Sequence, residues 1–161
     1  MRLAPLLLSL MSVTALVACA PQDSGAATST QAPAAHPVSG LRVVPLTVEA
    51  GGTAHRFRVE VAESAEAQAR GLMFRTEMGA DEGMIFPYAA PQQLSFWMRN
   101  TVLPLDLIFI GADKRVINVA ANAAPYSEQQ LLSDGPAIAV LELNGGRAAQ
   151  LGIGPGAKVS W

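Results

Sequence analysis

The chain is poor in cysteine, in charged residues and in aromatic residues. Of its 161 residues only one is cysteine, 15% are charged and 6% are aromatic. A single cysteine excludes a disulfide within the molecule, and one cysteine with two histidines leaves no ligand set for a His/Cys metal cluster. The formal net charge is −2 and no basic stripe is present, so the sequence lacks the electrostatic footprint of a nucleic-acid-binding protein. We therefore expect no metal, no other cofactor and no nucleic-acid partner.

Long apolar runs are confined to the N-terminus. The opening residues, MRLAPLLLSLMSVTALVACA, place Arg2 before an apolar stretch and small residues after it, which is typical of a secretory signal peptide over 1–18. No later run approaches the ~18 apolar residues that a membrane-spanning helix needs. The sequence therefore predicts export rather than membrane insertion through a helix.

The end of this segment, LVAC (16–19), resembles the lipobox of bacterial lipoproteins. The resemblance implies that Cys19 is acylated and becomes the mature N-terminus; the alternative is ordinary signal cleavage beside an incidental cysteine. Ala20 rather than aspartate follows the cysteine, and by resemblance to Gram-negative sorting signals this favours the outer membrane. We expect the chain to be held at the periplasmic face of that membrane through lipid on Cys19.

A flexible linker is predicted between the lipid and a single folded domain. Residues 19–40 are rich in Ala, Pro, Ser, Thr and Gly and show no hydrophobic periodicity, so they bury too little apolar surface to offset the entropy of ordering. The remaining residues, 41–161, are enough for one domain, and they contain no internal repeat.

The domain reads as mainly β. Two strand-like segments, 42–49 and 54–61, flank a Gly-Gly turn, and the second alternates apolar and polar residues as a hairpin strand does. A short helix is predicted over 63–72, with Ser64 as N-cap and Gly71 closing it in a left-handed conformation. Further strands are predicted at 83–86, 93–98, 105–110, 115–120, 137–143 and 157–161, with a helical turn at 147–151. The expected fold is a compact β-sandwich or partly closed barrel of seven or eight short strands.

Two carboxylates interrupt apolar strand faces. Asp106 alternates with isoleucines in 105–110, and Glu142 alternates with apolar residues in 137–143. A buried carboxylate without a partner costs several kcal/mol, so each should be paired or lie beside an opening. Arg99 is the nearest cation in sequence to Asp106. If 93–98 and 105–110 are antiparallel neighbours, we expect these two residues to form an ion pair.

Two interpretations of this polar group stay open. In the structural one, Asn100 ties down the bend beside the Arg99–Asp106 pair. In the functional one, Trp97, Arg99 and Asp106 line a polar pocket, with Arg75 and Glu142 as further candidates. A carboxylate pair, Asp106 with Glu142, would be suited to acid–base chemistry if the two met in space.

Four motifs together resemble domain-of-unknown-function family 192. They are ARGLMFR (69–75), EGMIF (82–86), FWMRNTVLPLDLIFI (96–110) and AVLELNGG (139–146), within a resemblance that covers roughly residues 46–161. The resemblance implies a small, mainly β domain that is often exported, and it implies no activity. The matching positions are Arg70, Gly71, Met73, Arg75, Gly83, Trp97, Arg99, Asn100, Pro104, Asp106 and Glu142.

The leading hypothesis is a non-catalytic envelope lipoprotein whose β domain binds a small ligand or an envelope protein. No recognisable nucleophile or metal set supports an enzyme, but an enzyme that uses Asp106 or Glu142 as acid or base is the second hypothesis. The third is a purely structural accessory domain without a pocket.

Overall fold

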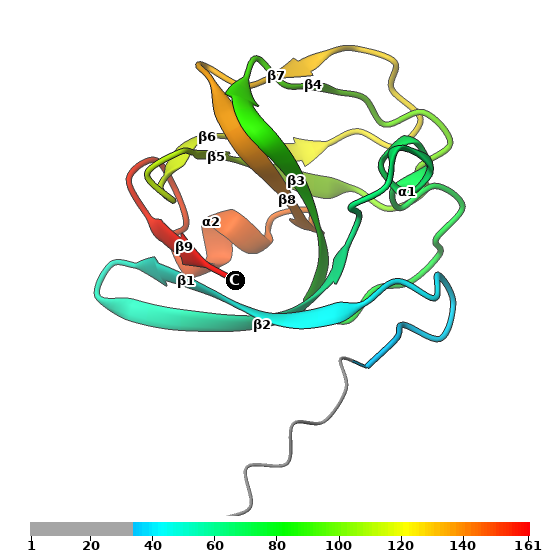
Figure 1. Cartoon of the computed structure of the whole chain (residues 1–161), viewed down its shortest axis with the longest axis horizontal. Helices are drawn as coiled ribbons and strands as arrows, with labels where there is room; N and C mark the ends of the chain where they lie inside the picture. Colours follow the sequence, from blue (N-terminus) through cyan, green and yellow to red (C-terminus); the bar gives the residue numbers. More distant parts are fainter. Residues whose placement is uncertain (1–33) are drawn as a thin grey trace, which may run out of the picture. The chain divides into compact units, whose positions relative to one another are not determined.

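The computed structural model describes residues 34–161. The predicted signal peptide, Cys19 and the linker up to residue 33 lie outside the described residues. Within them the chain forms the strands and helices that Figure 1 labels. Their bounds are β1 (Val43–Ala50), β2 (Thr53–Val61), α1 (Ala65–Arg70), β3 (Glu82–Gln92), β4 (Ser95–Phe96), β5 (Leu105–Gly111), β6 (Val116–Ala123), β7 (Leu131–Leu132), β8 (Ala137–Asn144), α2 (Arg147–Leu151) and β9 (Lys158–Ser160).

Seven strands form one mixed sheet in the order β6-β5-β8-β3-β2-β1-β9, and β4 pairs with β7 in a separate small sheet. Only the β2–β3 pair of the large sheet is parallel. The mainly β fold class is confirmed. The two strands that are apolar on both faces, β5 and β8, are neighbours inside the sheet, as their sequences predict.

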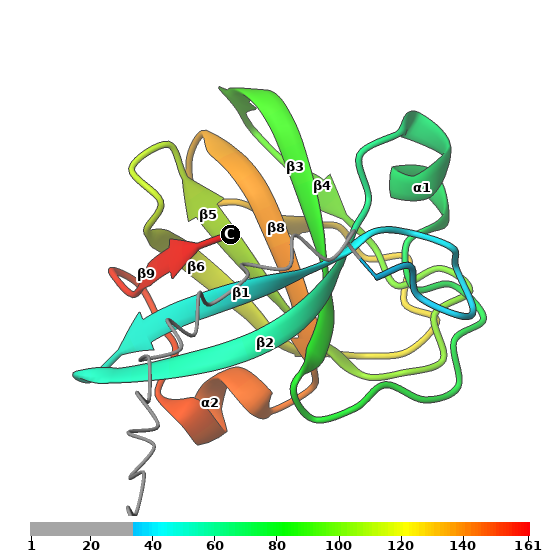
Figure 2. The same ribbon diagram turned by 60° about the horizontal axis from the view of Figure 1, so that its bottom comes forward.

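The large sheet curls around α2 without closing into a continuous barrel (Figures 1 and 2). The last strand, β9, pairs with β1 at one edge. It also reaches the turn before β6 at the other edge, where the Val159 N–H donates to the Lys114 carbonyl over 2.8 Å and Arg115 bridges Lys158. A three-residue strand therefore spans the gap between the two edges.

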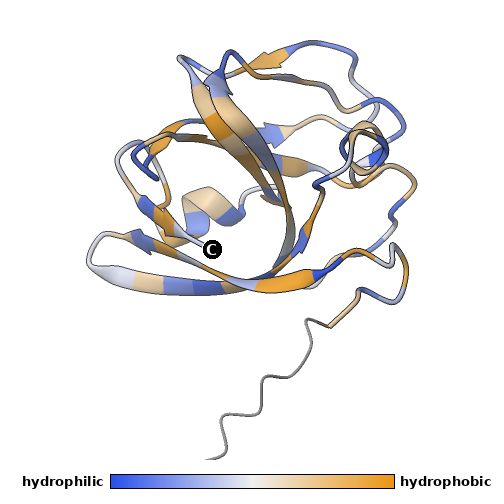
Figure 3. Cartoon of the chain, in the orientation of Figure 1, coloured by the Kyte–Doolittle hydropathy of each residue, from blue (hydrophilic) through white to orange (hydrophobic). Residues whose placement is uncertain are grey.

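The two faces of the sheet bury separate cores. Along β8, Leu141 and Leu143 belong to the core on the α2 face, whereas Val140 belongs to the core on the opposite face. Apolar residues, orange in Figure 3, run along most of this strand. Because side chains alternate between faces, Glu142 shares its face with Val140 and points away from α2.

The predicted strand 93–98 is the main departure from expectation. Only Ser95 and Phe96 are extended, and they pair with β7 in a segment predicted as loop. The pairing extends through Ser133, whose hydroxyl and N–H bond the N–H and carbonyl of Leu94 at 3.0 Å each. The segment 93–98 is therefore not a neighbour of β5, contrary to the condition on which the Arg99–Asp106 pair depended.

The prediction of a flexible linker up to residue 40 is wrong for residues 34–40. The His36 N–H donates to the Leu41 carbonyl and the Val43 N–H to the Ala34 carbonyl, both over 2.8 Å. The Ser39 hydroxyl donates to the carboxylate of Glu60. The alternation of β2 placed Glu60 on a polar face, but it is only 3% exposed because the turn 36–40 covers it.

Starting the chain at Leu41 is expected to lower the melting temperature by several degrees. The truncation removes the hydrogen bond that the Ser39 hydroxyl donates to the Glu60 carboxylate. A hydrogen bond to a charged group contributes ~1.5–3 kcal/mol to stability, which corresponds to a shift of several degrees in a domain of this size. A chain starting at Ala34 is the control, and its melting temperature should equal that of the chain of residues 19–161. Equal melting temperatures for the Leu41 and Ala34 chains, measured by differential scanning calorimetry, would contradict this account.

Candidate functional site

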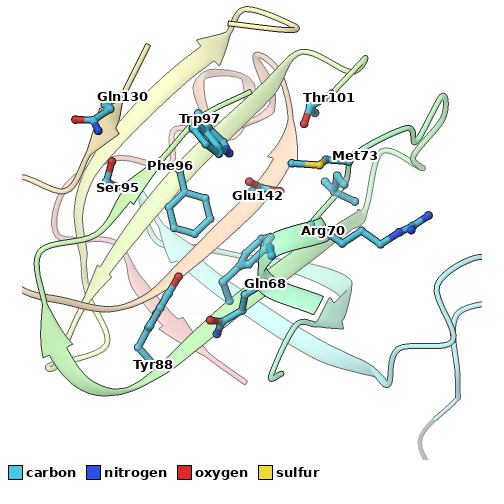
Figure 4. A pocket seen from close by; sticks show the side chains of 14 residues that line it. Gln68, Arg70, Met73, Tyr88, Ser95, Phe96, Trp97, Thr101, Gln130 and Glu142 are labelled. Atoms are coloured by element: carbon cyan, nitrogen blue, oxygen red, sulfur yellow. The ribbon is translucent and has the colours of Figure 1, made fainter. Parts of the chain in front are cut away.

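A pocket of about 430 Å³ opens on the face of the sheet opposite α2 (Figure 4). One wall is the end of α1 and the residues after it, from Gln68 to Met73. The other walls come from β3, from β4 with Trp97, and from Thr101 and Gln130, while β8 contributes Glu142. Sites that hold small molecules in proteins commonly have volumes of ~300–1,000 Å³.

Glu142 is the buried carboxyl group of this pocket. In the sheet it lies opposite Met84 of β3 and Leu107 of β5, both apolar and buried. Gly83 lets β3 approach closely here, since a Cβ at that position would lie 2.5 Å from the Glu142 carbonyl oxygen. The residue is 5% exposed, and burial raises the pKa of its carboxyl group from 4.5 to about 8. Within residues 34–161 its carboxyl group has neither a hydrogen-bond donor nor an ion-pair partner to offset that burial.

Aromatic rings line the same pocket as this carboxyl group. Phe96 packs edge-on against Phe86, with ring centroids 5.1 Å apart, and against Phe109, 6.3 Å apart. Trp97 also lines the pocket and is 48% exposed, so it borders the opening. Burial raises the pKa of Tyr88 above 10.0, and the negative charge of Glu142 raises it further. The pocket is therefore aromatic, with one buried acid.

The α1 wall is fixed in place by local sequence. The Ser64 hydroxyl accepts the Ala67 N–H over 3.1 Å and caps the helix, as predicted. Gly71 ends it with φ 47° and ψ −135°, which is a positive φ but not the left-handed helical conformation expected there. The Gln68 side-chain amide donates to the Pro87 carbonyl over 2.9 Å and ties α1 to β3. Figure 4 shows the Arg70 guanidinium directed away from Glu142.

Three loops beside the pocket hold residues at positive φ. Phe74, Asn100 and Tyr126 have φ values of 63°, 55° and 61°. The Phe74 N–H donates to the Asn100 carbonyl, and the Tyr126 N–H to the Thr101 carbonyl. Phe74 and Tyr126 are 64% and 61% exposed. Backbone strain and exposed aromatic rings are both common at functional sites, so these loops agree with a site at the pocket.

The structure separates the predicted polar residues. Trp97 and Glu142 meet in the pocket. Arg99 lies outside it, with its guanidinium 5.7 Å from the Trp97 ring and its Nε 3.8 Å from the Glu128 carboxylate, both side chains exposed. The Asn100 side-chain amide lies 3.9 Å from the sulfur of Met73. The predicted Arg99–Asp106 ion pair is wrong.

Asp106 instead binds three backbone N–H groups. Its Oδ1 accepts from Asn122 over 2.7 Å and from Gly146 over 2.9 Å, and its Oδ2 accepts from Ala148 over 2.7 Å. It is fully buried on the α2 face, opposite Leu143 in the sheet. Gly146, the N-cap of α2, has no side chain to cap the helix, so Asp106 supplies that function from β5. This carboxylate is structural.

Arg75 belongs to the buried group at Glu60. Its Nη2 lies 3.0 Å from the Glu60 carboxylate, and His36 lies 3.6 Å from the other oxygen. Arg75 does not line the pocket of Glu142. Of the six residues predicted as a polar site, two line this pocket, and three of the remaining four support the surrounding fold.

The aromatic walls of the pocket were not predicted from the sequence. Phe86 and Tyr88 lie two residues apart in β3, a spacing that puts both on one face, but their partner strand was not predictable. The hydrogen-bonding residues Gln68, Ser95 and Gln130 come from segments without a motif. Among residues 34–161, no cluster of three or more His, Cys, Asp or Glu residues is placed to hold a metal ion. In that same range, neither helix has the length and apolar character to cross a membrane.

Comparison with known proteins finds similar solved structures and one matching family. A crystal structure of a protein of unknown function from Novosphingobium aromaticivorans DSM 12444 superposes with a TM-score of 0.79 at 59% identity, covering 82% of this chain and 94% of that one. A second crystal structure, of a protein from Sinorhizobium meliloti 1021 described as a proposed transcription regulator, has a TM-score of 0.73 at 35% identity, covering 74% of this chain and 94% of that one. No curated protein matched. The model of the family DUF192, described as Uncharacterized ACR, COG1430, matches residues 46–161. The chain therefore belongs to the DUF192 family.

Proposed function

We propose that this domain is a non-catalytic binding module that holds a small molecule in the pocket of Glu142. The observation that carries the proposal is a buried carboxyl group that has no partner among residues 34–161 and faces an aromatic pocket. Such a group costs folding stability, and residues that lower stability are retained where function needs them. A pocket with aromatic walls and a few polar groups is the usual form of a small-molecule site.

Three other functions have less support. Acid–base catalysis by the Asp106–Glu142 pair is disfavoured because the two carboxylates face opposite sides of one sheet, and Asp106 is occupied by three N–H donors. A purely structural accessory domain gives no reason for an open pocket around an acid that the described part of the chain leaves unpaired. A role as a transcription regulator, which is how the Sinorhizobium protein is described, gains no support for nucleic-acid binding from a net charge of −2.

The proposal is tested by a fragment screen on the soluble chain, defined as residues 19–161 with Cys19→Ser. The chain has two tryptophans, and Trp161 does not line the pocket, so Trp161→Phe leaves Trp97 as the single tryptophan, whose emission can be excited selectively. Fragments of neutral, cationic and anionic character should include binders that change Trp97 fluorescence. Phe96→Ala should weaken them, whereas Glu77→Gln, at an exposed position, should not. A screen without any fragment that depends on Phe96 would refute a binding function.

We also propose that Cys19 anchors the chain in the envelope, with the domain on the periplasmic side of the outer membrane. Mass spectrometry of the chain purified from bacterial membranes should find a mature N-terminus at Cys19 with diacylglycerol and a third acyl chain, because multiple chains give the stable anchoring that one chain does not. Cys19→Ser should release the chain from the membrane fraction. An unmodified N-terminus at another residue would contradict lipidation.

A further inference from the structure

We infer that the pocket takes a ligand carrying a protonated amine on an apolar or aromatic body, with the Glu142 carboxylate as its counter-ion. This inference rests on the binding function proposed above and adds the chemical class of the ligand. It starts from the composition of the walls. Four aromatic residues line the pocket, Phe86, Tyr88, Phe96 and Trp97, and the faces of aromatic rings attract cations.

The charges around the pocket agree with a cation. The titratable groups that line it are Glu142 on β8, Tyr88 on β3 and Arg70 on α1. Arg70 is exposed and directed away from Glu142 (Figure 4), so it does not neutralise the acid. The neighbours of Glu142 in the sheet, Met84 and Leu107, are apolar. A bound cation would give the buried carboxylate the partner that the described residues do not.

Binding of such a ligand is linked to proton release. Burial raises the pKa of Glu142 to about 8, so the free pocket is protonated near neutral pH. An amine cation stabilises the ionised carboxylate, and Glu142 gives one proton to solvent when the ligand binds. Below the pKa of the free pocket, affinity should rise about tenfold per pH unit, and above it the dependence should flatten. The pKa of Tyr88 is raised above 10.0, so Tyr88 stays neutral in this range.

The test uses three probes of one shape: 3-phenylpropylamine, 3-phenylpropanol and 3-phenylpropanoate. Their affinities for the soluble chain are measured by isothermal titration calorimetry at about pH 6, 7 and 9, in buffers of different ionisation enthalpy that count released protons. The amine should bind more tightly than the alcohol at about pH 9, with the acid weakest. Near pH 7 its binding should release close to one proton.

Glu142→Gln separates the charge from the shape of the pocket. In this variant the amine should lose its pH dependence, its proton release and its advantage over the alcohol, while alcohol binding persists. Glu63→Gln, at an exposed position outside the pocket, is the matched control and should keep the amine preference. Equal affinity for amine and alcohol, no proton release, or no amine binding at about pH 9 would overturn the inference. Those results leave the binding function itself to be decided by the fragment screen.

Discussion

Replacing Asp106 with alanine is expected to lower the free energy of unfolding by on the order of 4 kcal/mol. Three backbone N–H groups, of Asn122, Gly146 and Ala148, lose their acceptor in a fully buried site. A buried donor left without a partner costs ~1–3 kcal/mol, and hydrogen bonds to a charged acceptor are the stronger ones. Since small domains have a total stability of ~5–15 kcal/mol, this loss brings the domain near unfolding at ordinary temperatures.

The matched variant is Arg99→Ala, which removes the cation predicted to pair with Asp106. Its ion pair with Glu128 is exposed on both sides, and such pairs contribute ~0–1 kcal/mol, so urea unfolding should change little. The loss of unfolding free energy in Asp106→Asn should fall between those of Arg99→Ala and Asp106→Ala, because one carboxylate oxygen becomes an NH₂ group that faces N–H donors. Comparable losses in Arg99→Ala and Asp106→Ala would restore the ion-pair account.

Replacing Glu142 with glutamine is expected to stabilise the domain, and more so as the pH rises. The folded pKa of about 8 lies above the value of 4.5 for the exposed group. Folding thus favours the protonated acid. The contribution of Glu142 to the free energy of unfolding is therefore fully present below about pH 4.5 and is lost as pH rises through about 8. One pKa unit corresponds to about 1.4 kcal/mol, so ionisation costs the folded state on the order of 5 kcal/mol. Glutamine keeps the shape and avoids that cost.

Urea unfolding of both proteins at about pH 5, 7 and 9 measures this effect. The two should be of similar stability at the lowest pH, and the glutamine variant should be the more stable by several kcal/mol at the highest. Glu77→Gln, which changes an exposed glutamate, should show a small difference that does not grow with pH. If the stability difference between the wild type and Glu142→Gln were the same at all three pH values, water or another group would have to solvate the carboxylate. Stabilisation together with loss of fragment binding would show the exchange of stability for function.

Local patterns predicted the parts of this fold that depend on local sequence. Alternation identified the β1–β2 hairpin, and Ser64 marked the start of α1. Alternation also placed Asp106 and Glu142 on buried faces, which is confirmed. These features follow from the residues of one segment, so a reading of that segment is enough to find them.

The partners of the two acids could not be predicted, for different reasons. Asp106 binds main-chain N–H groups at residues 122, 146 and 148, and every residue except proline has such a group, so no sequence signal marks them. The surroundings of Glu142 depend on the strand order β5-β8-β3, which brings β3 beside a strand that follows it by more than forty residues. The error over Arg99 arose from assuming that consecutive strands are neighbours.

The position of β9 has a consequence for how the chain folds as it is synthesised. Its residues Lys158–Ser160 join β1 to the turn before β6, so the two edges of the sheet are linked by a strand that is synthesised after the other six strands of that sheet. A nascent chain that lacks these residues has two unpaired sheet edges, which are available to other strands. Contacts between segments so far apart in sequence also form slowly. The sheet is thus completed only once β9 has been synthesised, and until then its unpaired edges make the chain prone to aggregation.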